Sequence, residues 1–275
     1  MSPSQAPTSF PIRSADGVEL RVWVEGSGPP MVLVHGSFTD HTAWEIPIGE
    51  LRGRFTTYAM DRRGFGASGD GSEYSIELEF EDVAAVVEGV ADRAGQSVVL
   101  WGHSYGANCV MGGASLTSQV SHLILYEPSF GLAYPPGAVE EAEEALEAGD
   151  RETAVTRMLI DILQLTTEEV DGLRDSPRWP LILAGAHTTP RECRVEHGWE
   201  YRQGQFEGIT APTLLLSGSE STASVRAATD RAAAAIPDAR IHVLEGHAHF
   251  AHRTAPALVV SVIVNFIAAG PGPGG

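Results

Sequence analysis

One serine in this chain has the sequence context of a nucleophile. Residues 102–106 read Gly-His-Ser-Tyr-Gly, directly after the largely apolar run 97–101 and directly before a stretch that favours a helix. A Gly-x-Ser-x-Gly sequence between a strand and a helix is typical of a sharp turn, because larger side chains beside the serine would clash there. The N-terminus of the following helix favours negative charge. We therefore predict that Ser104 is a nucleophile, and the alternative is an ordinary glycine-containing turn.

A serine hydroxyl is a weak nucleophile at neutral pH, so it needs a base that removes its proton as it attacks. Histidine is the side chain that most often does this near neutral pH. Of the 10 histidines, His247 and His249 directly follow a predicted strand at residues 240–244. A loop after that strand lies at the same edge of a parallel sheet as Ser104, so either imidazole is a candidate base.

Short apolar segments bounded by Gly, Pro, Asp or Ser alternate with helical patterns along most of the chain. We predict strands at residues 18–24, 31–34, 56–60, 98–101, 123–126, 213–217 and 240–244. We predict helices at residues 41–51, 75–94, 107–116, 224–235 and 255–268. Apolar strands without alternation indicate a sheet that is covered on both faces. The predicted fold class is therefore α/β, a doubly wound and mostly parallel sheet with functional groups at the carboxyl ends of its strands.

One interval breaks this alternation. Residues 131–208 contain no convincing strand, but helical patterns occur at residues 139–148, 151–165 and 167–173. We expect this interval to be an inserted helical cap over the carboxyl edge of the sheet, with residues 1–130 and 209–275 forming the core. The alternative is a set of peripheral helices that contact no site.

The chain is acidic, with 36 Asp and Glu residues against 18 Lys and Arg residues and a formal net charge of −18. Nucleic acid and anionic membrane are therefore poor partners, and a neutral or cationic small-molecule substrate is favoured. The length of 275 residues suits one large domain or a domain with an insertion. The composition leaves the oligomeric state open.

Cys109 and Cys193 are the only cysteines, and neither belongs to a spacing that is typical of a disulfide framework or a metal site. We expect no metal and no organic cofactor. Residues 1–10 lack the basic and apolar regions of a secretory signal, and no apolar run is long enough to cross a bilayer. These features favour a cytoplasmic location. The Gly/Pro-rich residues 270–275 are expected to be disordered.

Four motifs agree in order and spacing with one known fold family. They are His-Gly-Ser at residues 35–37, Asp-Arg-Arg-Gly-Phe-Gly-Ala-Ser-Gly at residues 61–69, the serine turn at residues 102–106, and Gly-His-Ala-His at residues 246–249. The chain resembles α/β-hydrolase-fold proteins of the esterase, haloperoxidase and C–C hydrolase type over almost its whole length. The resemblance is specific to a fold rather than to a reaction.

The resemblance implies roles for several residues. In this family the base stands several residues before the proline that opens the last helix, which is Pro256 here, so His249 is favoured over His247. The two backbone amides that stabilise a tetrahedral oxyanion would come from Ser37 and Tyr105. The aromatic residues that we expect to line the pocket are Phe38, Trp44, Trp199 and Tyr201.

The third member of a Ser-His-acid triad departs from the family pattern. The family usually carries an Asp in the loop after the strand at residues 213–217, three residues past Gly218. This chain has Ser221 at that position. Glu220 is one residue early, and its longer side chain could compensate. Glu127 closes the strand at residues 123–126, where certain haloalkane dehalogenases and lipases carry their acid. We predict Glu127 as the acid and keep Glu220 as the alternative; a dyad without an acid is the third possibility.

The predicted function is a serine hydrolase that cleaves an uncharged, fairly apolar ester, lactone or related carbonyl compound through an acyl-enzyme. One alternative is a cofactor-independent lyase, cyclase, C–C hydrolase or perhydrolase that uses the same residues. Another is a ligand-binding protein whose triad has degenerated. Haloalkane dehalogenases and epoxide hydrolases resemble the chain in fold, but they carry an aspartate where Ser104 stands.

Overall fold

The central strands of the protein are built from the continuous apolar runs of its sequence. In the computed structural model, which describes residues 8–270, every residue of β3 (Pro30–Val34), β5 (Val98–His103) and β7 (Thr213–Gly218) is buried. The remaining strands are β1 (Thr8–Arg13), β2 (Glu19–Gly26), β4 (Thr56–Met60), β6 (Val120–Tyr126) and β8 (Arg240–Leu244). Most of the N-terminal segment at residues 1–10, and the tail at residues 271–275, lie outside the described residues.

The eight strands of the described chain form one sheet in the order β1-β2-β4-β3-β5-β6-β7-β8. β1 pairs with β2, and β2 with β4, in antiparallel fashion, whereas every other neighbouring pair is parallel. The predicted α/β fold class, a mostly parallel doubly wound sheet, is therefore confirmed. The antiparallel strand β1 was not predicted from the sequence.

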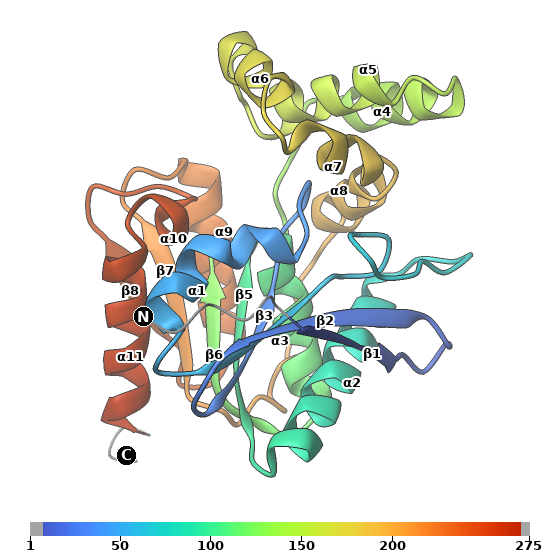
Figure 1. The fold of residues 1–275 in the computed structure, drawn as a ribbon. Coiled ribbons are helices and arrows are strands. Elements are labelled where there is room, and N and C mark those ends of the chain that lie inside the picture. The colour runs from blue at the N-terminus through green and yellow to red at the C-terminus, as the bar shows by residue number, and fades with distance from the viewer. Residues whose placement is uncertain (1–7, 271–275) are drawn as a thin grey trace.

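Helices cover both faces of this sheet (Figure 1). The helices of the core are α1 (Glu45–Leu51), α2 (Ile76–Ala94), α3 (Tyr105–Leu116), α9 (Ala223–Ala235), α10 (Ala251–Thr254) and α11 (Pro256–Ala269). Val32 and Val34 of β3 belong to the apolar cluster of α2 and α3, whereas Met31 and Leu33 belong to the cluster of α1 and α11. This alternation explains why β3 is apolar throughout.

Residues 131–208 form helices between β6 and β7. They are α4 (Ala138–Glu147), α5 (Arg151–Arg157), the π-helix η2 (Met158–Ile162), α6 (Thr167–Arg174), α7 (Trp179–Ala184) and α8 (Thr189–His197). In Figure 1 they lie beyond the edge of the sheet at which β5 runs into α3. A separate apolar cluster holds them together, and it includes Met158, Val170 and Ile182. We call α4–α8 the helical insertion.

Two helical predictions needed correction at their boundaries. The predicted helix at residues 41–51 is a 3-10 helix, η1 (His41–Trp44), followed by α1. The Asp40 side chain caps the start of η1 by accepting from the Thr42 amide. The predicted helix at residues 151–165 changes to a π-helix at Met158. No helix within residues 8–270 has both the length and the apolarity to cross a membrane.

Candidate active site

Ser104 occupies a strained turn between β5 and α3. Its φ of 56° and ψ of −126° lie in a region that residues other than glycine rarely adopt, and strain of this kind is common at functional sites. A Cβ atom at Gly106 would lie 2.3 Å from the His35 carbonyl oxygen, and one at Gly102 would lie 2.4 Å from the Gly106 carbonyl oxygen. Only glycines therefore permit this turn, which leaves the Ser104 side chain partly exposed.

His249 and Glu127 are in direct contact. Nδ1 of His249 lies 2.6 Å from Oε2 of Glu127, and the other carboxylate oxygen accepts a hydrogen bond of 2.7 Å from the Gly218 amide. Burial alone would raise the pKa of Glu127, but the hydrogen bond and charge of His249 hold it below its usual value. The carboxylate is completely buried, whereas the imidazole is 23% exposed. Glu127 is thus ionised and fixes the orientation of the ring.

The alternative acid lies elsewhere. The Glu220 side chain is exposed, and its hydrogen-bond partner among the described residues is the neighbouring Ser219 hydroxyl at 3.4 Å. Its backbone amide donates to the carbonyl of His247, whose own imidazole makes no hydrogen bond within residues 8–270. Of the two candidate carboxylates, the structure brings Glu127 to the histidine and does not bring Glu220.

Two buried side chains hold the loop that carries His249. The Tyr126 hydroxyl donates to the Ala248 carbonyl at 2.5 Å and accepts from the Ala251 amide at 3.0 Å. His103 Nε2 lies 2.8 Å from the His249 carbonyl oxygen, and the two rings are 4.5 Å apart between centroids. Because His103 directly precedes Ser104, this contact places His249 at the same edge of the sheet as the serine.

Ser104 Oγ has no hydrogen bond to His249 in the part of the chain that the structure describes. Both side chains are partly exposed at this edge. Hydrogen bonds between catalytic groups are often long without substrate and tighten in the reactive complex. Nδ1 of His249 is engaged by Glu127, so Nε2 is the ring nitrogen left for the serine.

The loop after β3 runs beside Ser104. A Cβ atom at Gly36 would lie 3.0 Å from the Cβ atom of Ser104, so glycine allows this close approach. The amides of Ser37 and Tyr105 make no hydrogen bond with any residue in the 8–270 range. Tyr105 is also the first residue of α3, where backbone N–H groups lack partners within the helix. Within residues 8–270, these two amides are therefore hydrogen-bond donors without a partner.

The four aromatic residues expected at a pocket lie in different environments. Phe38 is 7% exposed and packs with the apolar cluster of the helical insertion. Trp44 is completely buried and packs edge-on against Trp101, so it belongs to the core. Trp199 and Tyr201 line a surface hollow of about 740 Å³ beside α9, whose lining does not include Ser104 or His249.

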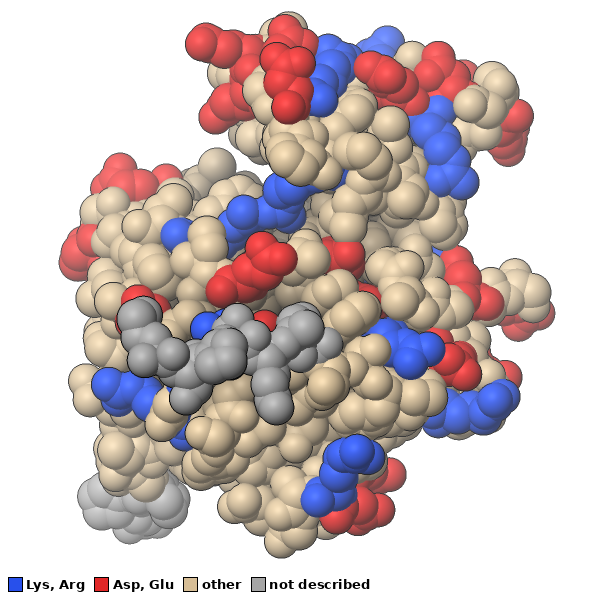
Figure 2. Space-filling model, in the orientation of Figure 1, with Lys and Arg blue, Asp and Glu red and all other residues tan. Residues whose placement is uncertain are grey.

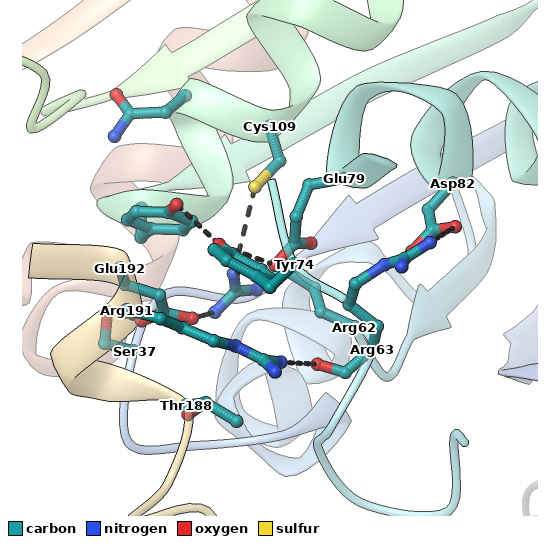
Figure 3. Close-up of polar contacts among 12 residues, drawn as sticks. Ser37, Arg62, Arg63, Tyr74, Glu79, Asp82, Cys109, Thr188, Arg191 and Glu192 are labelled. Atoms are coloured by element: carbon teal, nitrogen blue, oxygen red, sulfur yellow. Dashed lines mark hydrogen bonds and ion pairs between the residues drawn. The ribbon is translucent and has the colours of Figure 1, made fainter. Parts of the chain in front are cut away.

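The sequence analysis missed a buried polar cluster beside Ser37. Arg62, Glu79 and Glu192 are almost completely buried, and Arg62 contacts both carboxylates (Figure 3). They come from the turn after β4, from α2 and from α8, so no local sequence pattern joins them. The one sequence signal for this cluster was Arg62 itself, a charged residue in a turn that has a structural role.

One group of side chains has the spacing of a metal site. The ligand atoms of Asp40, His41 and Asp61 lie within 4.8 Å of one another. The Asp61 oxygens, however, already accept hydrogen bonds from the backbone of His41 and Ala67 and from the Trp23 indole. These contacts give the group a structural role in joining loops.

Comparisons with known proteins agree with this architecture. A model of the alpha/beta hydrolase family matches residues 31–262. A 2-(acetamidomethylene)succinate hydrolase of Mesorhizobium japonicum is 28% identical over 271 residues, which cover 91% of this chain and 92% of that protein. A 2-hydroxymuconate semialdehyde hydrolase of a Pseudomonas species is 23% identical over 272 residues and covers 92% of each chain.

Solved structures extend the comparison. An alpha/beta hydrolase from Sphaerobacter thermophilus superimposes with a TM-score of 0.80 at 31% identity, covering 94% of this chain and 99% of that one. The enol-lactonase from Burkholderia xenovorans, at 20% identity, shares the fold with a TM-score of 0.74 over 94% of this chain and 100% of its own. The resemblance stated from the sequence is confirmed: this chain belongs to the alpha/beta hydrolase family.

Proposed function

We propose that the protein is a serine hydrolase that cleaves a small carbonyl substrate, an ester or a lactone, with Ser104, His249 and Glu127 as its triad. The observation that carries this proposal is the 2.6 Å contact between His249 and a buried Glu127, at the sheet edge where the strained turn presents Ser104. That relay gives the imidazole the orientation and charge stabilisation that a general base for serine requires.

The proposed reaction has two steps. Ser104 Oγ attacks the substrate carbonyl carbon while Nε2 of His249 takes the hydroxyl proton, and the oxyanion is bound by the Ser37 and Tyr105 amides. The intermediate collapses to an acyl-enzyme when His249 returns the proton to the leaving oxygen. Water then attacks the acyl carbon, gives its proton to His249, and Ser104 leaves with that proton as the acid is released.

The substrate class follows first from the overall charge. A net charge of −18 favours an uncharged and fairly apolar carbonyl compound. The apolar packing of Phe38 with the helical insertion supports this, because that residue directly follows Ser37. We propose that the insertion acts as a cap over the site.

A local group of arginines favours a second candidate class, a carbonyl substrate with one carboxylate. Arg178 of the helical insertion donates a hydrogen bond of 2.9 Å to Thr39, two residues after Ser37. Arg253 follows His249 by four residues, and within residues 8–270 its guanidinium has neither a hydrogen bond nor an ion pair. Burial and repulsion by Arg178 lower the pKa of Arg253. Figure 2 shows blue side chains in the recess between the helical insertion and the core.

A cofactor-independent lyase, cyclase, C–C hydrolase or perhydrolase would use the same residues, and labelling together with ester turnover tests whether Ser104 acts as a nucleophile that is acylated. A fluorophosphonate probe should label the wild type at Ser104, and p-nitrophenyl esters of graded acyl length should be hydrolysed. The Ser104→Ala variant should lose both properties while its melting temperature stays within a few degrees of the wild type. Hydrolysis that survives in Ser104→Ala at the wild-type rate would refute the proposed nucleophile.

A further inference from the structure

A single buried cluster holds both residues whose amides are proposed to bind the oxyanion. The Ser37 hydroxyl donates a hydrogen bond of 2.5 Å to Oε2 of Glu192. The other oxygen of Glu192 lies 2.5 Å from Nη2 of Arg62, and the same Nη2 lies 3.3 Å from the Gly36 carbonyl oxygen. The loop of Ser37 is therefore bound at both its side chain and its backbone.

The cluster reaches Tyr105 by a second route. Nη1 of Arg62 lies 3.0 Å from Oε1 of Glu79, which also accepts a hydrogen bond of 3.4 Å from the Tyr74 hydroxyl. The Tyr74 and Tyr105 hydroxyls are 2.6 Å apart. The Arg62 guanidinium also lies 4.9 Å from the centre of the Tyr105 ring. Arg62 thus connects the side chains of Ser37 and Tyr105, and Figure 3 labels Ser37, Glu192, Arg62, Glu79 and Tyr74 along this path.

Burial makes these contacts stronger than they would be at the surface. Arg62, Glu79 and Tyr105 are 0% exposed and Glu192 is 1% exposed. Burial raises the pKa of Glu79 to about 7, although Arg62 opposes this. Of the two ion pairs of Arg62, the one with Glu192 is the shorter, at 2.5 Å against 3.0 Å for Glu79. A buried ion pair of this kind contributes little net stability, but breaking it leaves an uncompensated charge, so it favours one arrangement over others.

We propose that Arg62 and Glu192 are positioning residues that align the Ser37 and Tyr105 amides with the developing oxyanion. Glu192 belongs to α8 of the helical insertion, whereas Ser37, Arg62 and Tyr105 belong to the core. The oxyanion site is therefore complete only when the insertion is seated on the core. The inference rests on the proposed function, since it assigns a cause to the geometry of that same site.

The chain offers a matched control for Glu192. Glu196 lies one turn later in α8, is 5% exposed, and is also a hydrogen-bonded buried carboxyl, but its partners are Ser129 and Tyr134. Glu192→Gln and Glu196→Gln therefore make the same side-chain replacement in the same helix at similar depth. Only the first removes a contact with Arg62 and Ser37.

The test is the kinetics of these two variants and of Ser37→Ala on a p-nitrophenyl ester, together with inhibition by a boronic acid. A boronic acid forms a tetrahedral adduct with a serine and so reports on the oxyanion site directly. We expect Glu192→Gln and Ser37→Ala each to lower kcat about 10-fold with KM changed less than twofold, because a misplaced donor costs less than a missing one. Inhibitor affinity should fall by the same factor as kcat/KM.

Two further outcomes decide the proposal. The Ser37→Ala, Glu192→Gln double variant should lose little more activity than either single variant, because both remove one shared contact. Glu196→Gln should keep kcat and inhibitor affinity within about twofold of the wild type. A wild-type kcat in Glu192→Gln, or equal losses in Glu192→Gln and Glu196→Gln, would overturn the inference while Ser104→Ala stayed inactive. An active Ser104→Ala would instead overturn the proposed function.

Discussion

Nδ1 of His249 and Oε2 of Glu127 lie 2.6 Å apart although the two residues are 122 positions apart in the sequence. Glu127 directly follows β6, and His249 lies in the loop after β8, with β7 between those strands in the sheet. The proposed acid therefore approaches the histidine from the end of β6, the strand next to the one that precedes Ser104. The family more often carries its acid in the loop after β7, at the position where this chain has Ser221.

Replacement of Glu127 by glutamine should lower kcat by a factor on the order of 10³–10⁴, because a neutral amide neither selects the imidazole tautomer nor stabilises the imidazolium. The measurement is steady-state hydrolysis of a p-nitrophenyl ester. Glu220→Gln is the matched control, and its kcat should equal that of the wild type because its side chain is exposed. Loss of activity in Glu220→Gln alone would reassign the acid.

Replacement of Tyr126 by phenylalanine should loosen the loop that carries His249. The hydroxyl is a partner of both the Ala248 carbonyl and the Ala251 amide, so its removal leaves these two groups only the 3.1 Å hydrogen bond that they make with each other. We expect the free energy of unfolding to fall by about 1–3 kcal/mol and kcat to fall several-fold with KM little changed. Denaturant unfolding and initial rates check this, and an unchanged kcat would show that the loop is held by other contacts.

An alanine at Gly106 should be incompatible with the turn at Ser104. The new Cβ would lie 2.3 Å and 2.4 Å from the carbonyl oxygens of His35 and Val34, which are backbone atoms that cannot rotate away. We expect a loss of about 3 kcal/mol or more in the free energy of unfolding. Gly172→Ala in α6 is the control, since nothing lies within 4 Å of its added Cβ, and it should be neutral or stabilising. Equal stability of the two variants would contradict the proposed close packing.

Glu196 should make stability depend on pH. Burial raises its pKa to about 8, so the folded chain holds a proton that the unfolded chain has already released above its ordinary value. The stability that this bound proton contributes is fully present below the pKa of Glu196 in the unfolded chain, and it is lost as pH rises through 8. Glu196→Gln should flatten that decline, by roughly 4 kcal/mol between pH 5 and 9. Denaturant unfolding across this range measures it, and parallel curves for both proteins would disprove the assignment.

Arg253 should determine whether the enzyme accepts an anionic substrate. With a p-nitrophenyl half-ester of succinic acid, Arg253→Ala should lower kcat/KM about 10-fold, because a desolvated guanidinium and a carboxylate form a charge-assisted hydrogen bond. With the neutral p-nitrophenyl butyrate the change should stay below twofold. Arg231→Ala is the control. The Arg231 guanidinium donates to the Gly131 carbonyl and lines a hollow whose lining does not include Ser104 or His249. A wild-type enzyme that rejects the half-ester would leave the uncharged class as the substrate.

Much of this protein was predictable from local patterns. The sequence identified seven of the eight strands within residues 8–270. Continuous apolar runs revealed the central strands β3, β5 and β7, because a strand buried on both faces must be apolar throughout. The glycines around Ser104 identified the sharp turn, because its backbone excludes larger residues. β1 escaped prediction, since its six residues alternate between exposed and half-buried positions without a continuous apolar run.

The tertiary structure alone decided which carboxylate meets the histidine and what surrounds the oxyanion loop. Glu127 and Glu220 both follow strands that end at one edge of the sheet, so sequence position could not distinguish them, but Glu127 is buried against His249 and Glu220 faces solvent. The contacts of Arg62 with Glu79 and Glu192 span 17 and 130 residues. Contacts between such distant residues depend on how the elements pack, and local patterns in the sequence do not record that packing.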